Sequence, residues 1–254
     1  MRVAVAGSSG RMGRALVEEV LKDGELTLAA ALDIVSGPAI GGVGVSVDVD
    51  AAVAAADVLI DFTRPAGTLA HLEACERGGK AIVIGTTGFT ETEKQRIAQA
   101  AKNIPVFMSP NFAVGVNVMF KLVEVAARAL GDAYDIEIIE AHHRHKVDAP
   151  SGTALRLGEI VAGALDRDLA RVAVHGRAGE PGARPGKEIA FHAIRGGDIV
   201  GEHTVLFAGT GERVEVTVRS SSRATYALGA LRAARFLKGR RNGLYDMPDV
   251  LGLR

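Results

Sequence analysis

The sequence predicts an α/β protein in which a doubly wound parallel sheet is followed by a second domain of mixed helices and strands. Through about the first 100 residues, short apolar runs alternate with amphipathic stretches of helical spacing, as in parallel sheets covered by helices. Beyond residue 111 the pattern changes to a long helix and then to strands joined by glycine-containing turns. A chain of 254 residues is long enough for two domains of ordinary size.

The elements of the first domain follow from these runs. Buried strands are predicted where apolar residues are continuous, at residues 3–6, 26–32, 58–61, 81–84 and 104–108. Helices are predicted where apolar residues recur with helical spacing, at residues 10–21, 65–77 and 90–100. Right-handed crossovers should connect the parallel strands.

The second half is predicted to be a mixed domain. Helices are expected at 114–130, 153–165 and 224–237, and strands at 136–141, 189–194, 199–207 and 214–220. Glycine-containing turns at 195–198 and 208–211 suggest that the last three strands pair antiparallel. The Gly/Pro-rich stretch 176–187 is predicted to be a mobile surface loop, with a substrate lid as the alternative.

Composition excludes several partners and compartments. Lys plus Arg equals Asp plus Glu at 30 each, and with three Tyr, eight Phe and no Trp the chain offers few stacking platforms, so no nucleic-acid partner is expected. Cys75 is the only cysteine, which fits a reducing compartment. Met1 leads directly into a strand and no apolar run reaches membrane-spanning length, so we expect a cytoplasmic protein without a membrane partner.

A glycine-rich turn after the first strand predicts a dinucleotide site. In Gly7-Ser8-Ser9-Gly10-Arg11-Met12-Gly13, glycines at the start of a helix would let the backbone approach a diphosphate, although such a turn can also serve packing alone. Asp33, at the end of the second strand, is placed to bind the adenosine ribose. An acid there repels a 2′-phosphate whereas Arg11 attracts one, so NADH is favoured and dual use with NADPH stays open.

Three further turns follow strands at the same predicted edge of the sheet. Gly85-Thr86-Thr87-Gly88 follows the fourth strand and Ser109-Pro110-Asn111-Phe112 follows the fifth, where ligands of open α/β sheets bind. Asp61-Phe62-Thr63-Arg64-Pro65 ends the third strand and is interpreted as structural, with Thr63 as a helix cap and Pro65 at the first helical position.

The run Glu140 to Thr153 carries the strongest sign of chemistry. Five basic side chains, from His142 to Lys146, precede a helix start at which Ser151 is the expected N-cap. The Gly152 and Thr153 amides at this positive helix end, with the cations, would bind a carboxylate. A solvated basic loop is the plain alternative.

A metal site is the rival use of these histidines. His142 and His143 directly follow the predicted strand 136–141, and adjacent residues in strand conformation point to opposite faces. Arg144 and Lys146 would also repel a divalent cation. No metal is therefore expected.

With these motifs the chain closely resembles the 4-hydroxy-tetrahydrodipicolinate reductase (dihydrodipicolinate reductase) family of bacterial lysine and diaminopimelate biosynthesis. The resemblance covers essentially the whole chain and rests on five blocks in order: G-x-x-G-R-M-G, G-T-T-G, S-P-N-F, E-A-H-H-R-H-K-x-D-A-P-S-G-T and G-E-H-T-V. It implies a Rossmann-type dinucleotide-binding domain at 1–111, a mixed-sheet substrate-binding and oligomerisation domain at 112–222, and a C-terminal helix and tail at 223–254 that complete the first domain. It further implies a homotetramer and a small dicarboxylate substrate, reduced with NADH or NADPH.

The resemblance also assigns roles to individual residues. His142 and Lys146 are the proton donors, and the substrate is bound by His143, Gly152 and Thr153. The cofactor is bound by Gly7, Ser8, Ser9, Gly10, Arg11 and Met12 at the diphosphate, Asp33 at the ribose, Gly85, Thr86 and Thr87 at the nicotinamide end, and Ser109, Pro110, Asn111 and Phe112, which close the site. Family members that use NADPH well often have a basic residue after the ribose acid, where this chain has Ile34 in front of a glycine-rich loop. Arg144 and His145 receive no role.

Two other functions compete with this reading. A non-enzymatic dinucleotide sensor would need no imidazole and lysine beside an anion-binding helix start, and a sensor that binds DNA would need a basic recognition element that is not found. A related two-domain dehydrogenase of aspartate or homoserine should lack the Glu140 to Thr153 run. Both alternatives are less consistent with the sequence than the reductase.

Overall fold

The computed structural model describes all residues, 1–254, and divides them into two compact units. The first unit comprises Met1–Val114 and Arg223–Arg254, and the second comprises Gly115–Ser222. None of the helices combines the length and the apolar character needed to cross a lipid bilayer.

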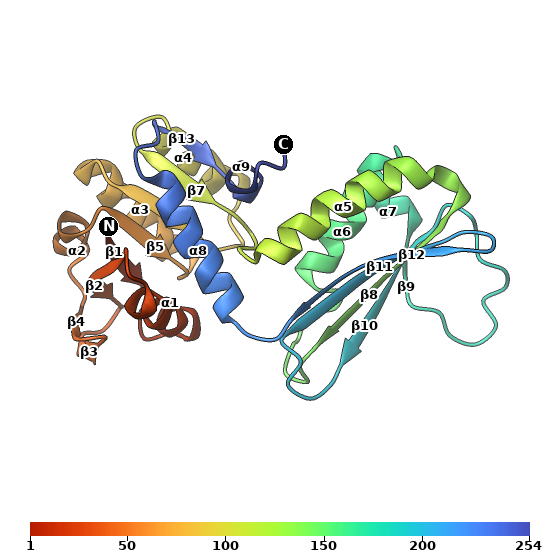
Figure 1. The fold of residues 1–254 in the computed structure, drawn as a ribbon, viewed down its shortest axis with the longest axis horizontal. Helices are drawn as coiled ribbons and strands as arrows, with labels where there is room; N and C mark the ends of the chain where they lie inside the picture. The colour runs from red at the N-terminus through yellow and green to blue at the C-terminus, as the bar shows by residue number, and fades with distance from the viewer. The chain divides into compact units, whose positions relative to one another are not determined.

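The first unit is built on an eight-stranded sheet (Figure 1). Every neighbouring pair is parallel except the antiparallel pair of β3 and β4 at one edge. This confirms the predicted doubly wound parallel sheet, and the chain changes direction across the sheet between β1 and β5. In spatial order the strands are β13 (Gly243–Tyr245), β7 (Pro105–Met108), β6 (Ala81–Ile84), β5 (Val58–Asp61), β1 (Arg2–Ala6), β2 (Thr27–Leu32), β4 (Val43–Ser46) and β3 (Gly37–Ile40).

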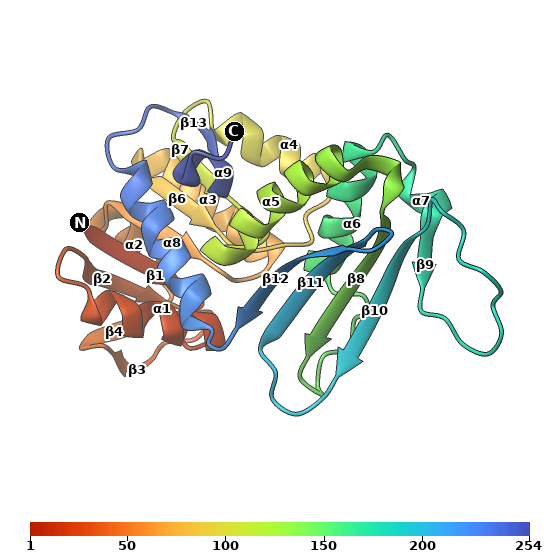
Figure 2. The same cartoon turned by 45° about the vertical axis from the view of Figure 1, so that its right-hand side comes forward.

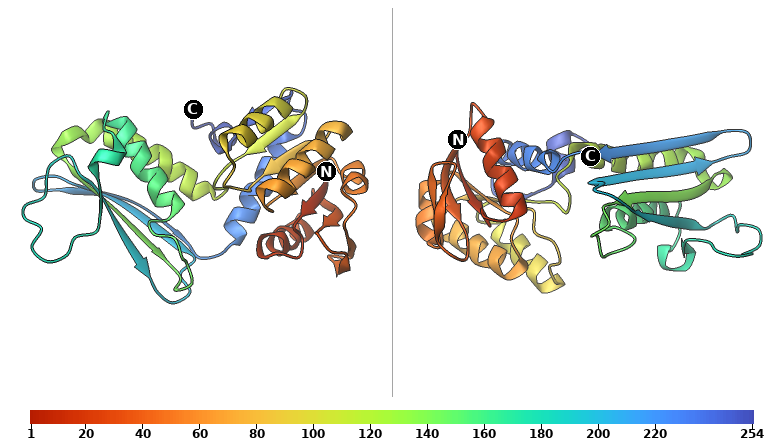
Figure 3. Two further views of the ribbon diagram at one scale, coloured as in Figure 1. Left: turned by 180° about the vertical axis from the view of Figure 1, so that it is seen from behind. Right: turned by 90° about the horizontal axis from the view of Figure 1, so that it is seen from below.

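Helices cover both faces of this sheet (Figure 3). On one face α1 (Arg11–Lys22) and α8 (Ala224–Leu237) bury their apolar stripes against β1, β5 and β6. On the other face lie α2 (Val49–Ala55), α3 (Pro65–Gly78) and α4 (Glu91–Ala100), while the short α9 (Met247–Leu251) packs with α8. The continuous apolar runs of the strands are therefore explained by burial on both sides.

The second unit is built on a five-stranded mixed sheet. The central strand β8 runs parallel to β10 and antiparallel to β11. The predicted antiparallel pair of β11 and β12 is confirmed, but the predicted pairing of β10 with β11 is wrong, because β8 lies between them. In spatial order the strands are β12 (Arg213–Ser220), β11 (Gly201–Ala208), β8 (Asp135–His142), β10 (Ile189–Arg195) and β9 (Ala173–His175).

Helices cover only one face of this second sheet (Figures 1 and 2). They are α5 (Val114–Leu130) and α6 (Gly152–Ala164), with η1 (Gly131–Ala133) and α7 (Leu169–Val172) as short connections. Along β8 the side chains of Ile136 and Ile138 point into this helix-covered core, and the alternation brings Glu140 and His142 onto the same face. Ile139 and, on β11, Leu206 lie on the opposite face, which no helix of the chain covers.

The Gly/Pro-rich loop 176–187 has no helix or strand, and ion pairs anchor it to the uncovered face of the sheet. Arg177 and Arg184 both donate to Glu137 on β8, at 2.8–3.1 Å, and Glu137 also accepts from His192 Nε2 at 2.6 Å. Burial alone would raise the pKa of Glu137, but these donors outweigh it and lower the pKa to about 2.

Candidate functional site

The glycine turn after β1 is shaped by close backbone approaches. Gly7 has a φ of +68°, and Gly10 N donates to Gly7 O at 3.0 Å. A Cβ added at Gly13 would lie 2.1 Å from Gly7 O, so only glycine lets α1 begin this close to the turn. Ser8 N donates to Leu32 O at 2.9 Å, which ties the turn to the end of β2.

This turn has the features of a phosphate-binding cradle. The N-cap of α1 is Gly10, which offers no side-chain cap, and the first turn of the helix holds no acidic residue. The Ser8 hydroxyl is fully buried and has no hydrogen-bond partner in the protein. Donors at the positive end of a helix and an unsatisfied hydroxyl suit an anion, so residues 7–12 fit the diphosphate of a dinucleotide.

Asp33 directly follows β2, as predicted from the sequence, and lies beside the same turn. Its Oδ2 accepts from Ser9 N at 2.9 Å and its Oδ1 accepts from Ile34 N at 2.8 Å. Partial burial would raise the pKa of Asp33, but these backbone donors hold it below its ordinary value, so the carboxylate is charged. Nearby, Ser9 and Arg14 help to line a hollow that is bordered by β3. The sequence predicted neither this hollow nor the hairpin of β3 and β4.

A buried carboxylate organises the loop after β6. Asp61, fully buried at the end of β5, accepts from Thr63 N at 2.8 Å, Thr63 Oγ1 at 2.7 Å and His71 Nδ1 at 2.6 Å. Thr68 Oγ1 donates to Thr86 Oγ1 at 2.8 Å, and both hydroxyls lie 3.2–3.4 Å from Asp61 Oδ1. The Gly85–Thr87 segment is thereby fixed to β5 and α3.

Thr63 is not the helix cap that the sequence suggested. The N-cap of α3 is Arg64, without a side-chain cap, although Pro65 does take the first helical position. The Thr63 hydroxyl is instead engaged by Asp61, which as a buried charged acceptor outweighs the helix end.

Residues 109–112 follow β7 at the same edge of the sheet. Ser109 N donates to Ile84 O at 3.3 Å, and Ser109 Oγ donates to Asn111 O at 2.8 Å, so the segment forms a tight turn. Phe112 is buried in the core, with its ring 5.2 Å from that of Phe62. Its side chain therefore serves packing, and only its backbone is left to border a ligand.

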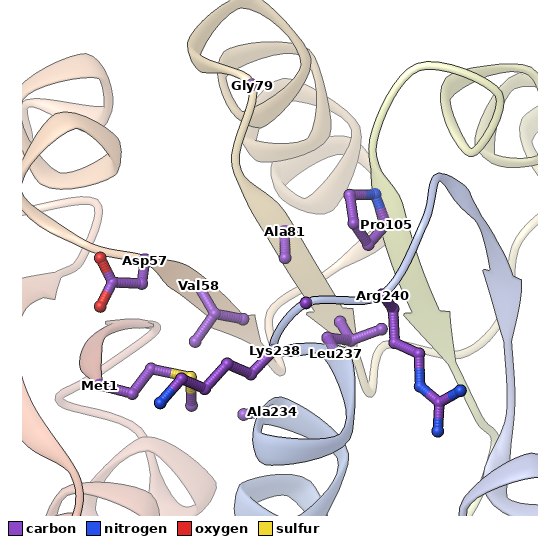
Figure 4. Close-up of a pocket in the computed structure, with 11 residues that line it drawn as sticks. Met1, Asp57, Val58, Gly79, Ala81, Pro105, Ala234, Leu237, Lys238 and Arg240 are labelled. Carbon is purple, nitrogen blue, oxygen red and sulfur yellow. The ribbon is translucent and has the colours of Figure 1, made fainter.

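A separate hollow lies at the amino ends of the parallel strands, opposite the ends that carry the glycine turn (Figure 4). No predicted site residue lines it, so it is distinct from the glycine turn. It is lined by Met1, Asp57, Val58, Gly79, Ala81, Pro105, Ala234, Leu237, Lys238, Gly239 and Arg240.

In the second unit, the predicted helix start at Ser151 is confirmed. Ser151 is the N-cap of α6, and its hydroxyl accepts from Ala154 N at 3.2 Å. Its backbone N–H donates to Glu140 Oε1 at 3.0 Å, which fixes the helix start to the end of β8. Gly152 and Thr153 form the first turn of α6 and thus lie at its positive end, and the N-cap Ser151 is linked to His142 through Glu140.

Glu140 and Arg195 form a nearly buried ion pair beside His142. Arg195 Nη1 and Nη2 donate to the two carboxylate oxygens of Glu140, each at 2.7 Å, across the parallel pair of β8 and β10. His142 Nδ1 lies 2.6 Å from Glu140 Oε2. Burial would raise the pKa of Glu140, but Arg195, His142 and Ser151 hold it below its ordinary value. The carboxylate is therefore ionised and His142 Nδ1 is the donor.

A second buried histidine packs against the first. The His203 ring lies 5.2 Å from the His142 ring in an edge-to-face arrangement, and His203 Nε2 is 2.9 Å from Ser151 Oγ. Burial lowers the pKa of His203 to about 4 and also lowers that of His142, although Glu140 opposes the shift at His142. Both imidazoles are therefore mainly neutral at pH 7 in the free protein.

The remaining cations of the run are more exposed. Lys146 Nζ is paired with Asp148 at 2.8 and 2.9 Å, so part of the expected positive charge is balanced within the run. His143 Nδ1 is buried without a partner in the protein, and its ring lies 6.2 Å from that of the exposed His145. No group of three His, Cys, Asp or Glu side chains has metal-binding geometry anywhere in the chain.

Sequence reasoning missed three members of this cluster. Glu140 stood in the quoted run without a role, Arg195 was interpreted as part of a turn, and His203 lay in the G-E-H-T-V block. The spacing of Glu140 and His142 on one strand was a usable signal. The pairing with Arg195, 55 residues away, depends on the strand order.

A glycine turn at the carboxyl edge of a parallel sheet, with an imidazole–carboxylate cluster in a mixed-sheet unit, defines a two-domain oxidoreductase that uses a pyridine nucleotide. Sequence profiles of "Dihydrodipicolinate reductase, N-terminus" and "Dihydrodipicolinate reductase, C-terminus" match residues 1–112 and 115–251. The chain therefore belongs to the dihydrodipicolinate reductase family.

Individual relatives align with this chain along its full length. The 4-hydroxy-tetrahydrodipicolinate reductases of Aromatoleum aromaticum and Dechloromonas aromatica are each 59% identical, over 100% of this chain and 96% and 98% of theirs. A dipicolinate-bound dihydrodipicolinate reductase from Paenisporosarcina sp. TG-14 has a similar structure, with a TM-score of 0.80, 27% identity and 97% of each chain covered.

Proposed function

We propose that the chain converts 4-hydroxy-tetrahydrodipicolinate to tetrahydrodipicolinate in lysine and diaminopimelate biosynthesis. In this reductive dehydration NADH or NADPH supplies a hydride, one proton is taken up, and the 4-hydroxyl leaves as water. The observation that carries this proposal is the cluster of His142, Glu140 and Arg195 beside the N-terminus of α6. It offers an imidazole for proton transfer next to a helix end suited to a carboxylate. Such a biosynthetic role would place the enzyme in the cytoplasm.

The first unit would hold the cofactor. Gly7, Ser8, Ser9, Gly10, Arg11 and Met12 would hold the diphosphate, Asp33 the adenosine ribose, and Gly85, Thr86 and Thr87 the nicotinamide end, with Ser109 to Phe112 closing the site. The unsatisfied Ser8 hydroxyl and the uncapped start of α1 support the diphosphate assignment. When bound, the reduced nicotinamide supplies a hydride to the substrate.

The second unit would bind the substrate and supply the proton. The Gly152 and Thr153 end of α6 binds one substrate carboxylate, and His143, whose Nδ1 is buried and unsatisfied, donates to the substrate as well. His142 donates the proton from Nε2, because Nδ1 is engaged by Glu140. A bound dianion raises the pKa of His142 and so compensates for its burial. Lys146, now paired with Asp148, contributes charge or a second proton.

NADH is the expected preference. The Asp33 carboxylate is held in place by two backbone amides and would repel a 2′-phosphate, and Ile34 follows it without a charge. Arg11, exposed at the first position of α1, keeps the use of NADPH open.

We also propose that the chain assembles as a homotetramer through the uncovered face of the second sheet. This face presents the apolar side chains of Ile139, Leu206 and the exposed Ile194. It also carries a hydrogen bond between Thr204 Oγ1 and Thr217 Oγ1 at 3.0 Å. A sheet face with apolar side chains and no covering helix favours self-association. Light scattering after gel filtration should give four times the chain mass, and a monomer would refute this part.

The activity test uses freshly made substrate. The condensation product of pyruvate and aspartate semialdehyde is mixed with the protein, and oxidation of NADH and NADPH is followed separately by absorbance. We expect rapid oxidation that depends on the condensation product, and His142→Gln serves as the matched control. If neither nucleotide is oxidised, the proposed function is refuted.

A further inference from the structure

Glu140 is the most enclosed charged group of the second unit. Its two oxygens accept from Arg195 Nη1 and Nη2, from His142 Nδ1 and from Ser151 N, all within 3.0 Å. A carboxylate has about four lone-pair positions, so these donors use its capacity. Glu140 therefore acts on other protein groups and does not contact the substrate.

Arg195 is committed in the same way. Nη1 also donates to Ile194 O and Nη2 to Asp148 O, each at 2.7 Å. The guanidinium thus joins β10, β8 and the loop before α6, and it holds the Glu140 carboxylate at a fixed angle to the His142 ring.

We infer that Glu140 and Arg195 are positioning residues that set which nitrogen of His142 exchanges protons: Glu140 holds Nδ1–H and leaves Nε2 for the substrate. This inference rests on the proposed function only through the role given to His142. The carboxylate also holds the ring in this orientation, because a ring flip would replace the Nδ1–H donor by the carbon Cδ2, and the other tautomer would place an unprotonated nitrogen against the carboxylate.

Several groups face His142 and shift its pKa in opposite directions. Burial lowers the pKa of His142 most, Glu140 raises it through its hydrogen bond and charge, and Lys146 and Arg195 lower it. His203, packed against the ring, is buried and neutral, and the charge of Asp148 is balanced by Lys146. Removing Glu140 or Arg195 should therefore shift the pKa of His142 in opposite directions, which general damage to the fold would not do.

The test measures the ring nitrogens of His142 by ¹⁵N NMR in the free, full-length protein. His142→Gln identifies its signals among those of the seven histidines. In the wild type the neutral ring should carry its proton on Nδ1. We expect Glu140→Gln to lower the pKa by about one unit and to mix the tautomers, and Arg195→Met to raise it by a similar amount. The alkaline limb of kcat/KM should move with each variant.

Glu137→Gln is the matched control, because it removes a glutamate from the same strand with similar Arg and His partners on the opposite face. It should leave the His142 titration in place. Unchanged tautomer and pKa in Glu140→Gln, or shifts of the same sign in both cluster variants, would overturn the inference. If Glu140→Gln does not fold, Arg195→Met decides alone. Absence of reductase activity in the wild type would refute the proposed function, whereas the NMR titration would still test the positioning.

Discussion

Replacing Asp61 by alanine should lower the denaturant concentration at which the first unit unfolds. This carboxylate is fully buried and makes three short hydrogen bonds, to Thr63 N, Thr63 Oγ1 and His71 Nδ1, at 2.6–2.8 Å. At about 1.5 kcal/mol for each bond to a charged group, the loss comes to about 4.5 kcal/mol. The range of about 3–5 kcal/mol for removing one partner of a buried pair agrees with this value.

Urea unfolding followed by far-UV circular dichroism measures this effect. With a slope of about 2 kcal/mol per molar urea, the midpoint should fall by about 1.5–2.5 M. The transition that belongs to the first unit is identified as the one that moves upward when NADH is added, since a bound ligand stabilises only the unit that holds it. Hydrogen exchange in α3 should increase in parallel.

Asp57→Ala provides the control. Asp57 immediately precedes the same strand and pairs with Arg2 at 2.8 Å, but both side chains are about half exposed. Exposed pairs contribute below about 1 kcal/mol, so this variant should unfold close to the wild type. If the free energy of unfolding of Asp61→Ala is also within about 1 kcal/mol of the wild-type value, the cluster around Asp61 does not stabilise the first unit as expected.

Four further outcomes are expected. His142→Gln should lower kcat/KM by about 10²–10⁴-fold in initial-rate assays, because it removes the acid. Thr153→Val should raise KM about tenfold or more with a smaller change in kcat, because it weakens a ground-state contact. Gly13→Ala should abolish NADH binding, measured by nucleotide fluorescence, since its Cβ would lie 2.1 Å from Gly7 O. Between pH 7 and pH 5 the free energy of unfolding of the second unit, measured with urea, should fall by about 2 kcal/mol. The reason is that buried His203, with a pKa lowered to about 4, stays neutral while the same histidine in the unfolded chain takes up a proton.

Each of these outcomes has a contrary result. Full turnover in His142→Gln would remove its role as acid, and a loss confined to kcat in Thr153→Val would argue against a carboxylate contact. Normal affinity in Gly13→Ala would mean that the turn tolerates a side chain. For His203, a His203→Gln variant should show a flatter pH dependence, and an equal slope would assign the effect to other groups.

Long elements with strong periodicity could be predicted from the sequence. The helices at 114–130 and 224–237 were predicted with the residues that the structure gives, because their apolar positions recur over several turns. The strands at 58–61 and 81–84 agreed as well. Burial on both faces makes such strands continuous apolar runs.

Short and edge elements could not be predicted. The β3–β4 hairpin lies in the glycine-rich stretch 36–44 and beyond it, where Val45 is the one buried apolar side chain of the two strands, so no period is visible. The strands β13 and β9 have three residues each. They are defined by pairing with β7 and β10, which is a tertiary property.

The site was predictable in its residue types but not in its connections. The turn 195–198 suggested a hairpin from β10 to β11, whereas the chain crosses the end of β8 there. That crossing is what brings Arg195 beside His142 and Glu140. A local turn signal cannot report a strand inserted between its two arms, so the ion pair was invisible in the sequence.

The first unit is completed by α8, which follows the whole second unit in the sequence, and this order has a consequence for synthesis on the ribosome. The buried face of α8, including Ala230, Leu231 and Ala234, fills the core above β5 and β6, yet it is translated only after the whole second unit. Until residues 223–254 emerge, the nascent sheet exposes an apolar surface that α8 must later cover. The second unit is contiguous in sequence and can form first, so nucleotide binding should be acquired only after residues 223–254 have emerged.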